Sequence, residues 1–158
     1  MSGSAADDLV RRDAVQLNLA GAQTIVAAAQ AKADSMGLKV NIVVVDSGGH
    51  LLAFARMDGA RPASIYTAQS KAVTAALKRG DSGPVVRGDA PPDARLNIAI
   101  ENAAAMSGGT FTTLNGGTVV VVDGQVIAGI GVGGATGSED AEIGSAGRDA
   151  LLQALQGQ

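Results

Sequence analysis

Three charged side chains in the first half of the chain have types and spacing suited to holding an anionic ligand. Arg56 and Asp58 are separated by one residue, and Lys71 follows in a predicted helix over residues 62–78. An arginine can clamp a carboxylate through two parallel hydrogen bonds, and a partly buried lysine serves as a base or cation once its pKa falls. The alternative is structural, with an Arg56–Asp58 pair fixing the turn and Lys71 capping a carbonyl. We take these three as the candidate catalytic residues.

A glycine-rich turn late in the chain is the second candidate. Gly129, Gly131 and Gly134 have the spacing of a dinucleotide fingerprint, but that fold needs a following parallel strand with an acidic residue at its end, and only a helix is predicted there. Backbone N–H groups, a helix N-terminus and a hydroxyl could still hold a carboxylate or a haem propionate. Close packing of glycines at a subunit interface is the alternative. The residues assigned to this anion site are Gly131, Gly133, Gly134 and Thr136.

His50 is the only histidine in the sequence. Imidazole titrates near neutral pH and binds iron, which suits a haem ligand or a general base. Its position directly after two glycines favours a solvent-facing residue of a hairpin instead. A single chain with one histidine cannot build a two-histidine metal or haem site, so no metal site is predicted. The other axial candidates, which packing explains equally well, are Met36, Met57, Met106 and Tyr66.

Three acidic residues begin the last predicted helix, namely Glu139, Asp140 and Glu142. They could be read as a metal or acid/base cluster. Acidic residues in a first helical turn, without histidine partners, usually cap the helix and complement its dipole. We favour the capping interpretation.

Hydrophobic periodicity and turn residues indicate which elements position these groups. Helices are predicted over residues 20–36, 62–78, 94–106 and 138–155, and strands over 15–19, 40–46, 50–56, 110–114, 117–122 and 125–132. Tight turns at 47–49 and 123–124 join two pairs of strands into hairpins. Hairpins favour an antiparallel sheet, so the expected fold class is α/β of the α+β kind, with about five central strands flanked by helices. The expected division is a flexible N-terminus over 1–12 and a single domain over 13–158.

Composition narrows the classes of function. The 158 residues are 46% hydrophobic but only 2% aromatic, so a core of small aliphatic side chains buries modest area and self-association would bury more. The net charge is −3, without a basic cluster, which argues against nucleic acid as a partner. No apolar run reaches the ~20 residues of a membrane span, and the N-terminus lacks a signal-peptide pattern. A cytoplasmic protein with no membrane partner is expected.

Three sequence blocks carry a family resemblance that extends over residues 15–155. The first runs from Val44 to Ala60, with Asp46-Ser-Gly-Gly-His50 at its start, and the second from Ser64 to Ala75. The third begins at Gly116-Gly117, continues through the 129–134 glycines and closes with Ala146-Gly147. In order and spacing these blocks resemble the GlcG/HbpS-like haem-degrading domain family. They also resemble the C-terminal domain of PduO-type corrinoid adenosyltransferases.

The resemblance implies a profilin-like sandwich, a symmetric homo-oligomer of four to eight subunits and, in some members, haem binding. Asp46 and Tyr66, which lie in the first two blocks, complete the predicted ligand-binding set. Haem-binding members use a histidine from the N-terminal helix, and residues 20–36 contain none. Haem is therefore kept as an expected cofactor only of an alternative function.

Three functions follow from these observations. The first is a catabolic-pathway protein that binds a small anionic organic ligand between Arg56, Lys71 and the glycine-rich turn, with acid/base chemistry if it is an enzyme. The second is a haem-binding, redox-sensing or haem-degrading oligomer. The third is a non-catalytic structural oligomer.

Overall fold

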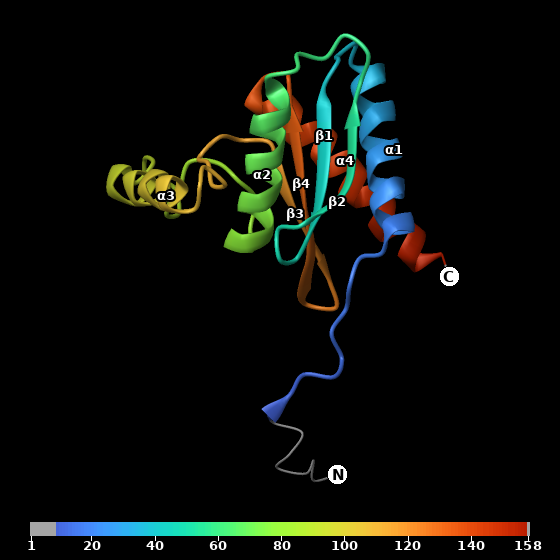
Figure 1. The fold of residues 1–158 in the computed structure, drawn as a ribbon, viewed down its shortest axis with the longest axis horizontal. Coiled ribbons are helices and arrows are strands. Elements are labelled where there is room, and N and C mark those ends of the chain that lie inside the picture. Colours follow the sequence, from blue (N-terminus) through green and yellow to red (C-terminus); the bar gives the residue numbers. More distant parts are fainter. Residues whose placement is uncertain (1–8, 158) are drawn as a thin grey trace.

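One antiparallel sheet organises the molecule (Figure 1). The computed structural model describes residues 9–157. The strands are β1 (Asn41–Asp46), β2 (Leu51–Arg56), β3 (Gly117–Val122) and β4 (Gln125–Gly133), in the order β2-β1-β4-β3. The helices are α1 (Leu19–Ser35), α2 (Ser64–Lys78), α3 (Ala94–Met106) and α4 (Gly137–Gln156). This is the expected α+β sandwich, with element bounds within about two residues of those predicted from periodicity.

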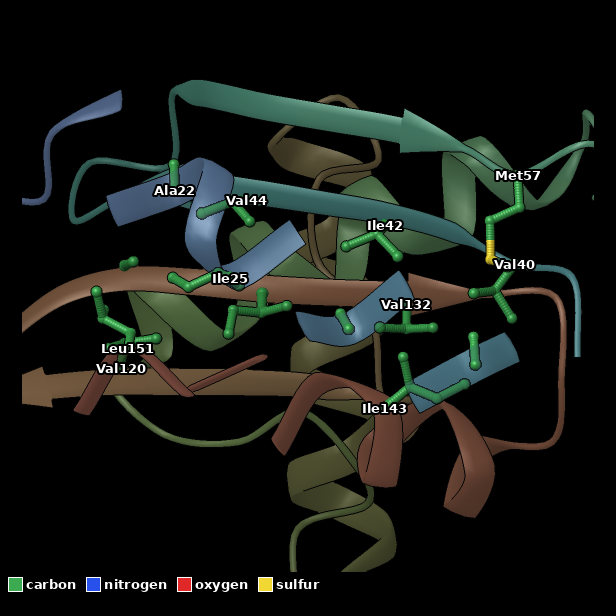
Figure 2. Close-up of a cluster of buried hydrophobic side chains, with 14 of the residues drawn as sticks. Ala22, Ile25, Val40, Ile42, Val44, Met57, Val120, Val132, Ile143 and Leu151 are labelled. Carbon is green, nitrogen blue, oxygen red and sulfur yellow. The ribbon is translucent and has the colours of Figure 1, made fainter. Parts of the chain in front are cut away.

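Helices cover both faces of the sheet. On one face α1 and α4 pack against the strands and enclose the main core, where Ile42 and Val44 of β1 meet Ile25 of α1 and Ile143 of α4. Figure 2 shows these side chains, together with Val132 of β4, converging on one cluster. The core is built from aliphatic residues, as the low aromatic content requires.

Helix α2 lies on the opposite face, unusually close to the strands. A Cβ atom built on Gly131 would overlap the carbonyl oxygen of Ala68, and one on Gly129 would overlap that of Ala72. Only a strand without side chains at these positions lets the helix backbone lie this near. The glycine stripe of β4 therefore serves close packing, but within the chain rather than between subunits.

The hairpin of β3 and β4 turns at Asp123 and Gly124, whose φ angles of +50° and +71° are those of a two-residue turn with positive φ at both positions. The hairpin turn predicted from Asp123 and Gly124 is therefore confirmed. Gly37, expected to end the first helix, likewise follows α1 with φ of +69°.

The predicted strand over 15–19 does not form, because a side chain takes the place of a neighbouring strand. Gln125 accepts the Val15 N–H through Oε1 at 3.0 Å and donates through Nε2 to the Asp13 carbonyl at 3.0 Å. Asn18 then caps α1 by accepting the Gly21 N–H. The flexible segment expected over 1–12 lies largely outside the described residues, and the domain boundary at 13 stays a prediction.

The predicted strand over 110–114 is also absent. The Thr112 N–H donates to the hydroxyl of Thr74 on α2, and the Leu114 carbonyl accepts the hydroxyl of Ser82. Side-chain hydroxyls thus satisfy backbone groups that a strand ladder would otherwise pair. For both reasons the sheet has four strands instead of about five.

Helix α3 stands away from the sheet, beyond α2 (Figure 1). Two irregular segments, residues 79–93 and 107–116, carry the chain out to α3 and back. The inner ends of these segments return to α2 and α4, where they form part of the site.

Candidate ligand-binding site

A buried ion pair joins α2 to α4. The Lys71 Nζ atom lies 2.7 Å from Asp140 Oδ2, with the two residues only 4% and 1% exposed. Lys71 also donates to the Val132 carbonyl at 2.8 Å. An ammonium group has three donors, so two are used inside the protein and one remains.

The first turn of α4 holds Asp140 in position for this pair. Asp140 sits in the first turn of α4, and its Oδ1 atom accepts the Ala135 N–H at 3.2 Å. Thr136 and Glu139 form a capping box that holds the turn in place. Gly116, with φ of +110°, passes so close that a Cβ there would lie 2.9 Å from Lys71 Nζ. Only a residue without a side chain can therefore pack this closely on the ion pair.

Burial raises the pKa of Asp140 above its ordinary value, although the hydrogen bond and charge of Lys71 act in the opposite direction. Together the two side chains carry no net charge, whichever of them holds the shared proton. Such a pair can move a proton over the 2.7 Å between Nζ and Oδ2 without placing an isolated charge in the interior.

The pair forms part of the wall of a cavity of about 550 Å³. The first turns of α2 and α4 both contribute to the wall, and helix N-termini carry partial positive charge. Residues from the two irregular segments on either side of α3, 79–93 and 107–116, complete the wall of the cavity. The lining residues are Arg61, Ala63, Ser64, Thr67, Lys71, Pro84, Thr113, Leu114, Asn115, Gly134, Ala135, Gly137 and Asp140.

The arginine of this cavity is Arg61, which the sequence reasoning did not select. Its backbone is fixed because its carbonyl accepts the Asn41 side-chain amide at 3.0 Å, and its side chain is exposed. The signal was present in the sequence, since Arg61-Pro62 directly precedes a helix and so places a cation at a helix N-terminus.

Arg56 and Asp58, the other two predicted catalytic residues, lie elsewhere. Both are exposed, and neither lines the cavity with Lys71. The reason is the strand order: Arg56 pairs with Asn41, which in turn pairs with Gly133, so Arg56 is two strands away from β4. The structure does not bring the predicted trio together.

The structure also separates the four residues of the predicted anion site. Gly134 lines the cavity. Gly131 and Gly133 are buried beneath α2, where added Cβ atoms would press on the backbone of Ala68 and Ser64. The Thr136 hydroxyl is engaged by Glu139 at 2.8 Å in the capping box.

His50, Asp46 and Tyr66 are at least partly exposed and do not line the cavity, and Met57 lies in the main core. His50 has an 83% exposed side chain, as expected of a hairpin residue, with Nδ1 3.3 Å from Asp46 Oδ1. The same Asp46 oxygen accepts the N–H groups of Gly48 and His50. Partial burial by itself would raise the pKa of Asp46, but these hydrogen bonds outweigh it and lower that pKa below its ordinary value. Tyr66 is 78% exposed and lines a separate, smaller hollow.

Comparison with known proteins identifies the family. The family model described as "Haem degrading protein HbpS-like" matches residues 17–149. The chain belongs to the HbpS-like family. Protein GlcG of Escherichia coli strain K12 is 40% identical over 111 residues, which cover 70% of this chain and 76% of GlcG.

Solved structures of the HbpS-like fold agree with this assignment. The crystal structure of a Streptomyces reticuli HbpS double mutant superposes with a TM-score of 0.71 at 30% identity, over 96% of each chain. A crystal structure of a PduOC–haem complex has a TM-score of 0.70 at 22% identity, covering 86% of this chain and 95% of the other. The latter likeness is one of fold.

Proposed function

We propose that this HbpS-like chain binds a small organic anion in the cavity beside Lys71 and Asp140. The proposal rests on the Lys71 ammonium group, which is 4% exposed and lines the cavity. It has three donors, two of which are used in hydrogen bonds to Val132 and Asp140. Within residues 9–157 two acceptors contact the Nζ atom, so a ligand oxygen in the cavity can accept the third of its three donors.

Charge in the rest of the cavity favours an anion as well. Arg61 supplies a guanidinium group whose forked donors match a carboxylate. The N-termini of α2 and α4 add partial positive charge. Asp140 is neutralised by Lys71, which leaves Arg61 as the uncompensated charge among the lining residues.

Should the protein be an enzyme, the Lys71–Asp140 pair is its acid/base group. A proton can pass between Nζ and Oδ2 at 2.7 Å, and the remaining Nζ donor contacts the ligand. A catabolic-pathway role, expected from the family resemblance, stays part of the proposal. Arg56 and Asp58 do not line this cavity, so in the proposal Arg61 takes the part first given to Arg56.

The test compares two exposed arginines. Small mono- and dicarboxylates (acetate, lactate, pyruvate and succinate) are titrated into wild type, Arg61→Ala and Arg56→Ala by calorimetry. We expect saturable binding of at least one, about tenfold or more weaker in Arg61→Ala, since one charge-assisted pair is worth about 1.5–3 kcal/mol. Arg56→Ala serves as the control and should match wild type. No binding, or equal affinity in both variants, would contradict the proposal.

Haem binding is the second candidate, favoured by the family description and by the haem complex of PduOC. The cavity does not suit the group, because none of the described lining residues is histidine, methionine, cysteine or tyrosine. Haem would have to bind elsewhere on the surface, for instance at His50. Titration of haemin into wild type and His50→Ala, followed at the Soret band, separates a saturable site from none.

Self-association is part of the proposal, with a tetramer to octamer as the expected assembly. It is supported by α3, which extends from the body with Ile98 and Met106 exposed. A purely structural oligomer is the alternative if the cavity binds nothing. Among residues 9–157, none of the helices is long and apolar enough to cross a bilayer. A cytoplasmic location stays a proposal.

A further inference from the structure

Lys71 differs from every other lysine of the chain. The sequence has four lysines. Lys32 and Lys39 form ion pairs with Glu142 and Asp34 at the surface, and Lys78 donates to a backbone carbonyl in an exposed position. Lys71 alone is buried, faces a cavity and is paired with a buried acid.

We propose that Lys71 forms a Schiff base with the carbonyl carbon of a small 2-oxo acid held in the cavity. This inference rests on the proposed anion-binding function and names its substrate class. The carbonyl group is placed at the Nζ atom and the carboxylate at Arg61. Both side chains line the same cavity, and that cavity of about 550 Å³ has the size of small-molecule sites in proteins.

The reaction needs an amine without its third proton, and Asp140 is placed to remove that proton. Its Oδ2 atom lies 2.7 Å from Nζ. Burial raises the pKa of Asp140, so its carboxylate is a better proton acceptor than an exposed one. An adjacent general base is one way in which enzymes activate a nucleophile.

The step balances without an oxidant or a reductant. Lys71 passes a proton to Asp140, and the freed electron pair on Nζ forms a bond to the carbonyl carbon while the C=O π bond breaks toward oxygen. A second proton moves from Nζ to that oxygen. Asp140 then returns its proton to the resulting hydroxyl, which leaves as water. One ammonium and one carbonyl compound give one iminium ion and one water.

The product keeps the charge balance of the buried site, with one N–H donor left on Nζ in place of three. The iminium ion keeps the positive charge of Lys71 next to the re-formed carboxylate of Asp140, so the buried pair stays neutral overall. The added carbon atoms would extend from Nζ into the cavity that Lys71 lines.

Reductive trapping tests the inference on the full chain. Wild type is incubated with pyruvate and sodium cyanoborohydride, and each of the four lysines is assayed by peptide mass spectrometry. We expect a carboxyethyl group on Lys71, formed at least tenfold faster than on Lys32, Lys39 or Lys78 and at a rate that saturates with pyruvate. Arg61→Ala should slow labelling of Lys71 about tenfold or more, whereas Arg56→Ala should leave it unchanged.

The wild-type measurement is decisive without any variant that perturbs folding. Labelling confined to the exposed lysines, or no labelling at all, overturns the inference. If carboxylates still bind by calorimetry in that case, the Schiff base fails alone and the proposed function stands. If carboxylates do not bind either, both fail.

Discussion

At the scale of single residues, the most consequential feature is an ion pair sealed between α2 and α4. Lys71 and Asp140 are each at least 96% buried, since their exposed fractions are 4% and 1%. Removing one partner of such a pair leaves the other as an uncompensated charge, whereas removing both need not destabilise the fold.

We therefore predict that Lys71→Met lowers the free energy of unfolding by about 3–5 kcal/mol. The double variant Lys71→Met/Asp140→Leu should recover a large part of that loss, because neither charge then remains. Urea unfolding of the two single variants and the double variant gives the coupling energy. Losses that simply add would show that the pair is not coupled in solution.

The capping carboxylate gives a pH prediction with a defined sign. Glu139 accepts the backbone N–H and the hydroxyl of Thr136, and both bonds lower its pKa below the ordinary 4.5. A group with a lowered folded pKa stabilises the protein above its unfolded pKa and loses that contribution as the pH falls through the folded value. Asp46, also with a lowered pKa, acts in the same direction.

The contribution of Glu139 to the stability of the wild type should thus be lost as the pH falls below about 4.5. Glu139→Gln keeps the hydrogen-bond geometry but does not titrate, so its stability should fall less steeply over the same range. Denaturant midpoints measured between pH 7 and pH 3 compare the two proteins. Parallel curves would exclude Glu139 as a source of the acid sensitivity.

At the scale of elements, the glycines of β4 decide how α2 sits on the sheet. Gly131→Ala would drive a methyl group into the Ala68 carbonyl, with backbone rather than a flexible side chain in the way. We expect a loss of about 1–3 kcal/mol or failure to fold, because a packed interior does not accept added volume.

Gly80→Ala is the matched control, since nothing lies within 4 Å of a Cβ at that position. Its stability should change little, or rise slightly as the unfolded chain loses freedom. Thermal unfolding of both variants distinguishes the cases. A fully stable Gly131→Ala protein would mean that α2 lies farther from β4 than the structure places it.

The start of α4 is the second element-scale determinant, because it carries both Thr136 and Asp140. Thr136→Ala removes the hydroxyl that accepts the Glu139 N–H at 3.3 Å. We predict a loss of about 0.5–2 kcal/mol, the usual cost of an N-cap. The measurement is equilibrium unfolding in urea, with an unchanged m-value expected.

At the scale of the whole molecule, α3 is the part that the single chain supports least. A helix of this length is marginal in water unless its apolar face packs against something. Ile98 is 61% exposed on it. If α3 takes part in the proposed self-association, Ile98→Glu should shift the molar mass measured by light scattering toward that of the monomer. Val10 is another exposed apolar residue, and the control variant Val10→Glu should leave the molar mass unchanged.

The sequence by itself determined the four helices, the two hairpins and the family. Hairpins, helix caps and stop residues depend on neighbours within a few positions, which is why Asp123-Gly124 and Gly37 were read correctly. The same locality explains the two strands that were wrong. The groups that replaced a strand partner, Gln125 and Ser82, are more than 30 positions distant from Val15 and Leu114.

Only the tertiary structure decided which charged residues meet. Lys71 and Asp140 are 69 positions apart, and Arg61 joins them although Arg56 had the more suggestive neighbours. Strand order sets this outcome, since it places β1 between β2 and β4 and so keeps Arg56 from the cavity. Asp140 shows the same limit, because a first-turn acid looks like a cap until its helix packs against a buried lysine.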